Sequence, residues 1–193
     1  MAEKELLLHC CCAPCFIVPL YKLRAEGKKI SAFWYNPNIH PLEEYQKRRN
    51  TLRDFTFKEN IELIEKDEYG LINFLQATLK DIENRCLYCY ETRLNATAKI
   101  AKELGYTAFG TTLLYSKYQK HELIVDIALK MSAKYGVDFF YEDWRCLWWE
   151  GKKLAKETGL YRQQYCGCIF SEEERFREQI QRDNLKQNKD LSN

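Results

Sequence analysis

The sequence lacks a long apolar run. No stretch approaches the roughly 18 consecutive apolar residues that a membrane-spanning helix needs. The chain starts Met-Ala-Glu-Lys-Glu and then has only three leucines in a row, which is too short for the apolar core of a secretory signal. We therefore expect no membrane partner and a cytoplasmic location, where the reducing thiol pool disfavours structural disulfides.

The sequence also lacks the glycine-rich loops that bind phosphates. It has 8 glycines in 193 residues, and neither Gly-x-Gly-x-x-Gly nor Gly-x-x-x-x-Gly-Lys-[Ser/Thr] occurs. The turn after the first apolar run carries Cys11, Cys12 and Cys15 where a phosphate loop would carry glycines. Nucleotide-driven chemistry is therefore not expected.

A strong charge of one sign is missing as well. The formal net charge is +2 at pH 7, which is too mild to predict a nucleic-acid partner by itself. Basic runs occur, for example at 47–49 and 175–177, but neighbouring acidic residues make a solvated helix face the more ordinary interpretation. A local basic face that contacts RNA stays open as an alternative.

Short apolar runs that alternate with helical patterns are present along most of the chain. Residues 6–8 are continuously apolar, as in a central strand of a parallel sheet that is buried on both faces. Further strands are predicted over 30–35, 61–64, 108–112 and 137–141, and helices over 14–23, 41–58, 86–104, 119–134 and from 71. This alternation predicts one α/β domain over 1–182, with a mainly parallel sheet flanked by helices, and a polar tail over 183–193.

The nine cysteines are the most informative feature of the sequence. Nine is odd, so complete internal pairing is impossible, and cytoplasmic cysteines in an enzyme-sized chain indicate metal binding or redox work. Seven of them fall into three short groups: Cys11, Cys12 and Cys15; Cys86 and Cys89; Cys166 and Cys168. The first group follows a predicted strand, where ligands gather and where a helix N-terminus favours the thiolate that a metal needs.

The chemistry of these groups has more than one interpretation. A single Cys-x-x-Cys pair such as Cys86 and Cys89 is also typical of a structural zinc site or of a thioredoxin-like dithiol. A tetrahedral zinc ion needs only four ligands, whereas seven grouped thiols favour an iron–sulfur cluster with further metal or redox capacity. We therefore favour iron over zinc on the residues alone.

Three residues beside these groups need a separate interpretation. Cys10 lies in an extended strand, where side chains alternate in direction, so it is predicted to fill the core rather than to join Cys11 and Cys12. Cys146 is predicted to be a buried apolar residue because tryptophans and a leucine surround it. His9 is either a ligand or acid–base group or a packed imidazole at the end of a core strand, and both interpretations stay open.

Five blocks of residues carry a family resemblance. They are 9–15 (His-x-Cys-Cys-Ala-Pro-Cys), 35–45 (including Tyr-Asn-Pro-Asn-Ile-His-Pro and Glu-Tyr), 85–94 (Arg-Cys-x-x-Cys-Tyr-x-x-Arg-Leu), 111–114 (Thr-Thr-Leu-Leu) and 161–171 (Tyr-Arg-Gln-Gln-Tyr-Cys-Gly-Cys-x-Phe-Ser). In this order the blocks resemble the epoxyqueuosine reductases of the QueH type, and they span nearly the whole chain.

The resemblance implies a fold, cofactors and a reaction. The fold is a single Rossmann-like domain related to the adenine-nucleotide hydrolase group, and the cofactors are a [4Fe-4S] cluster and an additional mononuclear iron. The reaction is the last step of queuosine biosynthesis, the two-electron reductive removal of the epoxide oxygen of epoxyqueuosine in tRNA with a GUN anticodon. An electron donor that the sequence does not identify is a further implied partner.

The resemblance also implies roles for individual residues. The seven grouped cysteines become metal ligands, and the assignment of each thiol to the cluster or to the extra iron stays open. Some family members carry Asp at the position of Cys15, which implies that this residue binds the extra iron and acts in catalysis. Tyr90 and His9 are unranked candidates for supplying the proton that the reaction needs.

Two rival hypotheses remain beside this one. A tRNA sulfur-transfer enzyme with an iron–sulfur centre would activate its base with ATP through a glycine- and serine-rich loop, but residues 11–15 stand in that place. A zinc-binding RNA-interaction module would be colourless when purified without air. The chain departs from the family pattern at Cys10 and at Trp148-Trp149, which concerns local packing rather than the reaction.

Overall fold

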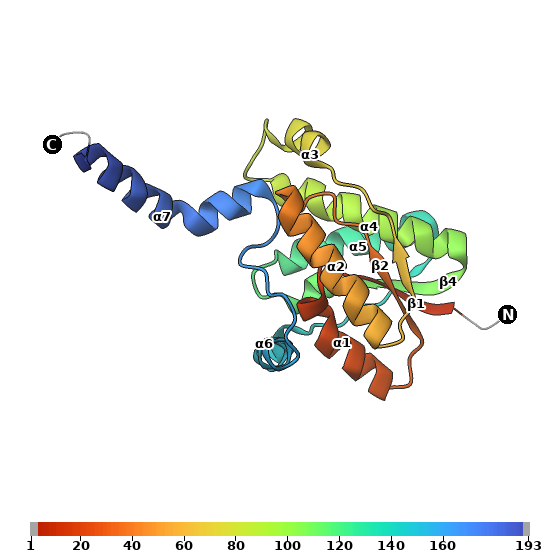
Figure 1. The fold of residues 1–193 in the computed structure, drawn as a ribbon. Helices are drawn as coiled ribbons and strands as arrows, with labels where there is room; N and C mark the ends of the chain where they lie inside the picture. The colour runs from red at the N-terminus through yellow and green to blue at the C-terminus, as the bar shows by residue number, and fades with distance from the viewer. Residues whose placement is uncertain (1–3, 191–193) are drawn as a thin grey trace.

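The fold is built on one parallel β-sheet with helices on both faces (Figure 1). The computed structural model describes residues 4–190, and the side chains as far as residue 186. The strands are β1 (Lys4–His9), β2 (Ile30–Trp34), β3 (Leu63–Glu65), β4 (Tyr106–Thr111) and β5 (Asp138–Phe139), and their order in the sheet is β3-β2-β1-β4-β5. Each neighbouring pair is parallel, so the predicted α/β fold is confirmed.

The helices form two layers around this sheet. They are α1 (Ala13–Ala25), α2 (Leu42–Lys58), α3 (Leu71–Thr78), α4 (Arg85–Leu104), α5 (His121–Tyr135), α6 (Trp148–Glu157) and α7 (Ile169–Asp190), with short 3₁₀ turns η1 (Thr112–Tyr115) and η2 (Arg145–Leu147). Helix α1 packs against α2 and α6, whereas α4 packs against α3 and α5. Burial of β1 between the layers explains its continuous apolar run, since Leu6, Leu7 and Leu8 are each at most 1% exposed.

Local sequence signals define two helix ends near the site. Pro14 lies in the first turn of α1, where its missing N–H removes no helical hydrogen bond, and Cys12 precedes the helix in an extended conformation. Helix α4 is followed by Gly105, whose φ of +77° is a left-handed backbone conformation that residues other than glycine rarely adopt. Both boundaries agree with the sequence prediction.

Most of the C-terminal segment that was predicted as a polar tail is helical. Helix α7 continues through Asp190 and projects away from the body of the molecule (Figure 1). Residues 183–190 therefore belong to a helix, while 191–193 lie outside the described residues. The limit of the domain at residue 182 stays a prediction. No helix within residues 4–190 is long and apolar enough to cross a membrane.

The burial predicted for Cys146 is wrong, because its side chain is exposed. The residue lies in η2, a 3₁₀ turn in which side chains three positions apart share a face. Trp144, which is 0% exposed, and Leu147 therefore share the inner face and contact the core, whereas Cys146 points elsewhere. Cys10, in contrast, is fully buried as predicted, and its thiol donates to the Leu8 carbonyl at 3.3 Å.

Candidate metal centre

The first cysteine group lies where the strand order of the sheet reverses. Strands β1 and β4 are neighbours there, and their carboxyl ends form the place where ligands usually bind in a sheet of this type. Cys11 and Thr112 meet across this point: the Cys11 backbone N–H donates to Thr112 Oγ1 at 3.2 Å, and the Thr112 hydroxyl donates to Cys11 Sγ at 3.6 Å. The fold thus positions the group at the usual ligand-binding edge of a doubly wound sheet.

Cys11, Cys12 and Cys15 form a compact triad of buried thiols. Their sulfur atoms all lie within 4.8 Å of one another. The Sγ atoms of Cys11 and Cys12 are 3.8 Å apart. Two thiolates on one tetrahedral metal, each bound at about 2.3 Å, would be about 3.8 Å apart, so the triad has the spacing of ligands to a single ion. Three ligands leave the fourth tetrahedral position for another molecule.

The three thiols of the triad titrate as a unit. Hydrogen bonds from the Cys12 and Cys15 thiols hold the pKa of Cys11 well below its usual value. Burial raises the pKa of Cys12, and the hydrogen bond to Cys11 raises the pKa of Cys15. These hydrogen bonds favour the thiolate form of Cys11, which is the form that binds a metal.

The other four grouped cysteines come from two distant segments. Cys86 and Cys89 lie at the start of α4, and Cys166 and Cys168 directly precede α7. The two segments meet, because Arg85, next to Cys86, forms an ion pair with Glu174 of α7 at 2.6 Å. Burial raises the pKa of Cys89 to about 12. No three of these four sulfur atoms lie within 4.8 Å of one another, so this second group is wider than the triad.

Arg93 is a buried cation at the second group. Its guanidinium is 2% exposed and donates to Cys89 Sγ at 3.0 Å and to the Cys89 carbonyl at 3.1 Å. No carboxylate pairs with Arg93 among the described residues. An unpaired buried charge is costly, so the interior around Arg93 requires negative charge, which thiolates and a thiolate-bound metal cluster provide. The donor set and this cation therefore fit an anionic metal centre.

His9 and Asn36 join Arg93 to the end of β1. The Asn36 amide nitrogen donates to the Cys10 carbonyl at 3.0 Å, so its Oδ1 faces His9 Nε2 at 3.2 Å and Arg93 Nη1 at 3.5 Å. The Tyr35 carbonyl also faces His9 Nε2, so this nitrogen carries the hydrogen. Burial and the charge of Arg93 lower the pKa of His9 to about 4, which keeps the ring neutral. These contacts favour the packed-imidazole interpretation.

Two amide side chains donate to the thiols. Gln119 Nε2 donates to Cys166 Sγ at 3.2 Å, and Gln163 Nε2 donates to Cys12 Sγ at 3.1 Å. The Tyr90 hydroxyl donates to Gln119 Oε1 at 2.8 Å and accepts the Lys120 backbone N–H, so Tyr90 reaches the centre through Gln119. Burial raises the pKa of Tyr90, which keeps its hydroxyl protonated.

Comparison with known proteins decides the family. A family model described as epoxyqueuosine reductase QueH matches residues 6–174. The chain belongs to this family. It is 39% identical to the epoxyqueuosine reductase QueH of Dehalococcoides mccartyi, over 91% of this chain and 96% of the relative. It is 37% identical to the QueH of Thermotoga maritima, over 86% of this chain and 88% of the relative. It is 34% identical to the QueH of Acinetobacter baylyi, over 86% of this chain and 80% of the relative.

The sequence alone did not single out several residues that surround the thiols. Asn36, Arg93 and Gln163 fall inside blocks that resemble the family, and this position is the signal that could have singled them out. Arg48 belongs to a basic run interpreted as a solvated face, but it is 1% exposed, bonds Glu44 at 2.7 Å and donates to the Cys166 carbonyl at 2.8 Å. Glu44 and Arg48 are four residues apart on one helix, and this spacing was the local sign of an ion pair between them.

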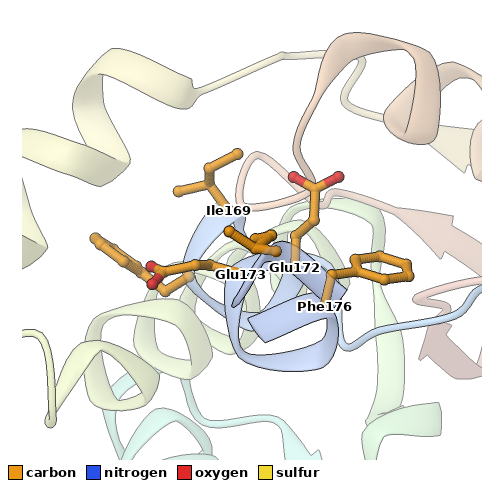
Figure 2. Close-up of a pocket in the computed structure, with 6 residues that line it drawn as sticks. Ile169, Glu172, Glu173 and Phe176 are labelled. Atoms are coloured by element: carbon orange, nitrogen blue, oxygen red, sulfur yellow. The ribbon is translucent and has the colours of Figure 1, made fainter. Parts of the chain in front are cut away.

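A hollow is lined by residues of α7 and by none of the triad cysteines. It runs along α7 and is lined by Ile169, Phe170, Glu172, Glu173, Phe176 and Ile180 (Figure 2). These residues include no thiol and no cation, so the hollow offers neither ligands for an iron–sulfur cluster nor a phosphate site. Of its apolar side chains Ile180 is 44% exposed, whereas Phe170 packs on Phe74 and Phe176 packs on Tyr165.

Proposed function

We propose that the protein is an epoxyqueuosine reductase that acts on tRNA with a GUN anticodon and yields queuosine. The observation that carries the proposal is the buried thiol triad at the carboxyl ends of β1 and β4, together with the buried Arg93–Cys89 pair. Membership of the QueH family supports it. The net reaction takes two electrons and two protons, breaks the two C–O bonds of the epoxide, forms the cyclopentene double bond and releases water.

The two cysteine groups hold different metals in this proposal. The triad of Cys11, Cys12 and Cys15 holds one iron ion, because its spacing is that of ligands to a single ion. The wider group of Cys86, Cys89, Cys166 and Cys168 holds a [4Fe-4S] cluster, which takes four cysteine ligands. Such a centre supplies electrons one at a time and a Lewis acid for the epoxide oxygen.

The side chains around the thiols tune their charge. Arg93, Gln119 and Gln163 each donate an N–H to a thiol sulfur. Hydrogen bonds to a ligating sulfur stabilise its negative charge, which makes addition of an electron to the centre easier. The same contacts fix the ligand rotamers before substrate arrives.

The three residues proposed to act in catalysis have different tasks. Cys15 belongs to the triad and would help to hold the separate iron. His9 holds Asn36 as a neutral ring, and Asn36 in turn contacts Arg93. Tyr90 orients Gln119 through its hydroxyl. In this arrangement His9 and Tyr90 are positioning residues, and both protons of the net reaction come from water that enters with the substrate. The electron donor is a low-potential one-electron carrier in the cytoplasm.

The decisive experiment is an anaerobic assay with purified protein. Iron and acid-labile sulfide are measured first, followed by conversion of tRNA bearing epoxyqueuosine with a low-potential chemical reductant. Mass analysis of the nucleosides should show loss of one oxygen atom. Cys10→Ala is the matched control, because Cys10 is a buried cysteine outside both groups. Stoichiometric zinc without sulfide would favour the RNA-binding zinc module, and dependence on ATP with incorporation of sulfur would favour the sulfur-transfer enzyme.

A further inference from the structure

Two large exposed aromatic side chains flank one lysine on the surface. Tyr118 is 74% exposed and Trp149 is 69% exposed, although they come from segments on either side of β5. Lys117 Nζ lies 5.3 Å from the centre of the Tyr118 ring and 5.1 Å from that of Trp149. Trp148 joins them, since its ring meets that of Tyr118 edge-on at 5.4 Å. A single cation that faces both rings shows that they converge.

The charge of this surface is positive. Lys152 Nζ lies 5.0 Å from the Trp149 ring, and neither Lys117 nor Lys152 makes an ion pair among the described residues. Residues 117–120 and 148–157 together carry five lysines and two glutamates. We call Lys117, Tyr118, Trp148, Trp149 and Lys152 the aromatic–lysine patch.

The patch adjoins the thiol centre and is connected to it by hydrogen bonds and by side-chain and helix packing. Gln119, the residue after Tyr118, donates to Cys166 Sγ at 3.2 Å. The Tyr115 hydroxyl donates to the Trp148 carbonyl at 3.1 Å, and the Tyr115 ring packs so closely on Gly151 that a Cβ there would lie 2.8 Å from its Cζ. Helix α6 also packs on α1, the helix that carries Cys15. A polymer with one unit in the centre would therefore have its neighbouring units at the patch.

We propose that the aromatic–lysine patch binds the unpaired nucleotides of the substrate RNA that flank the reacting nucleoside. This inference rests on the proposed function. Exposed aromatic faces stack on bases of any sequence, and lysines beside them bind the phosphates, which is the usual combination for single-stranded RNA. An enzyme that takes one nucleoside into a buried site also needs contacts to the flanking nucleotides. An acidic protein surface would need the lysines but not two exposed ring faces.

The test measures binding of an anticodon stem–loop RNA to anaerobically purified holoenzyme. Tyr118→Ala and Trp149→Ala should each weaken binding about tenfold, because one stacked base is lost, and Trp149→Phe should recover much of the loss. Lys117→Ala combined with Lys152→Ala should lower the slope of log Kd against log salt by about 1.4, the value for two phosphate contacts to a single strand. Iron content should stay unchanged in all of these variants.

The matched controls are Phe57→Ala and Lys58→Ala. Phe57 is 90% exposed, and both residues lie at the C-terminal end of α2, at the opposite edge of the sheet from the thiols. Neither change should affect RNA binding. If wild-type holoenzyme binds the RNA and the Tyr118 and Trp149 variants bind it equally well, the inference is overturned and the proposed function stands.

Two further outcomes overturn the inference in recognisable ways. In the first, the patch variants bind RNA normally and have normal activity with a chemical reductant, but their turnover is slower with an acidic electron-carrier protein. That result would assign the patch to binding of the carrier. Wild-type holoenzyme that binds no RNA and removes no oxygen would overturn the proposed function and this inference with it.

Discussion

The Arg93 guanidinium donates a hydrogen bond of 3.0 Å to the sulfur of Cys89 inside the protein. Arg93 also contacts the Cys89 carbonyl and Asn36 Oδ1, so a single cation links the second cysteine group to the residues that follow β2. A buried guanidinium with sulfur as its charged partner is stable only if that sulfur carries negative charge. The pair is therefore a sensitive reporter of the metal centre.

Replacement of Arg93 should separate charge from geometry. Arg93→Met leaves buried thiolates without their cation, and we expect loss of iron and a decrease of about 3–5 kcal/mol in the free energy of unfolding. Arg93→Lys keeps the charge but loses the planar fork, so it should retain more iron than the Met variant. Iron analysis and anaerobic denaturation measure both effects. Full iron content in Arg93→Met would show that the centre does not need this cation.

Variants of the two cysteine groups should lose different properties. Cys89→Ala removes a proposed cluster ligand, so brown colour and activity should disappear together. Cys15→Ala should keep most of the visible absorption but lose activity, because the ligand of the separate iron is missing. Visible spectra, iron counts and nucleoside mass analysis distinguish the two. A colourless Cys15→Ala protein would place Cys15 in the cluster instead.

Cys15→Asp is the conservative partner of that experiment. A carboxylate also binds iron, so this variant should retain the extra iron and a measurable part of the activity. The iron count and the rate are compared with those of Cys15→Ala. An Asp variant that keeps its iron and is as inactive as the Ala variant would show that the carboxylate does not replace the thiol.

The two cysteines outside the groups should be dispensable for the metals. Cys10→Ala should lower the free energy of unfolding by on the order of 1 kcal/mol, because it removes a buried sulfur and leaves a small cavity. Cys146→Ala should leave stability nearly unchanged, because the side chain is exposed. Iron and sulfide per chain should match the wild-type values in both. Loss of iron from either variant would require a different division of the nine cysteines.

Tyr90→Phe should behave like Gln119→Ala. Both changes weaken the support of Cys166 through Gln119, so each should lower kcat about tenfold and retain the iron. The reduction potential of the centre, measured by optical titration, should shift in the same direction in both variants. A far larger loss of kcat in Tyr90→Phe, with no change in potential, would identify Tyr90 as the proton donor.

Local sequence patterns were sufficient for the order of the elements and for the grouping of the thiols. The continuous run of Leu6 to Leu8, Pro14 in the first turn of α1 and Gly105 at the end of α4 each act within a few residues, so they can be interpreted without the fold. The parallel sheet follows from strands that alternate with helices, and the position of Cys11, Cys12 and Cys15 follows from the end of β1.

The tertiary structure alone decided which groups meet. Gln163 bonds Cys12 across 151 residues and His9 bonds Thr111 across 102, and no local pattern encodes such contacts. The same holds for Arg48. Its charge predicts an exposed side chain, but in the folded protein it is buried against Glu44 and the carbonyls of Tyr165 and Cys166. Exposure of Cys146 likewise depends on a 3₁₀ turn that Trp144 anchors in the core. A side chain's environment is set by the segments that pack on it, which is why residue type and spacing predict the ligands but not their separation into a triad and a wider group.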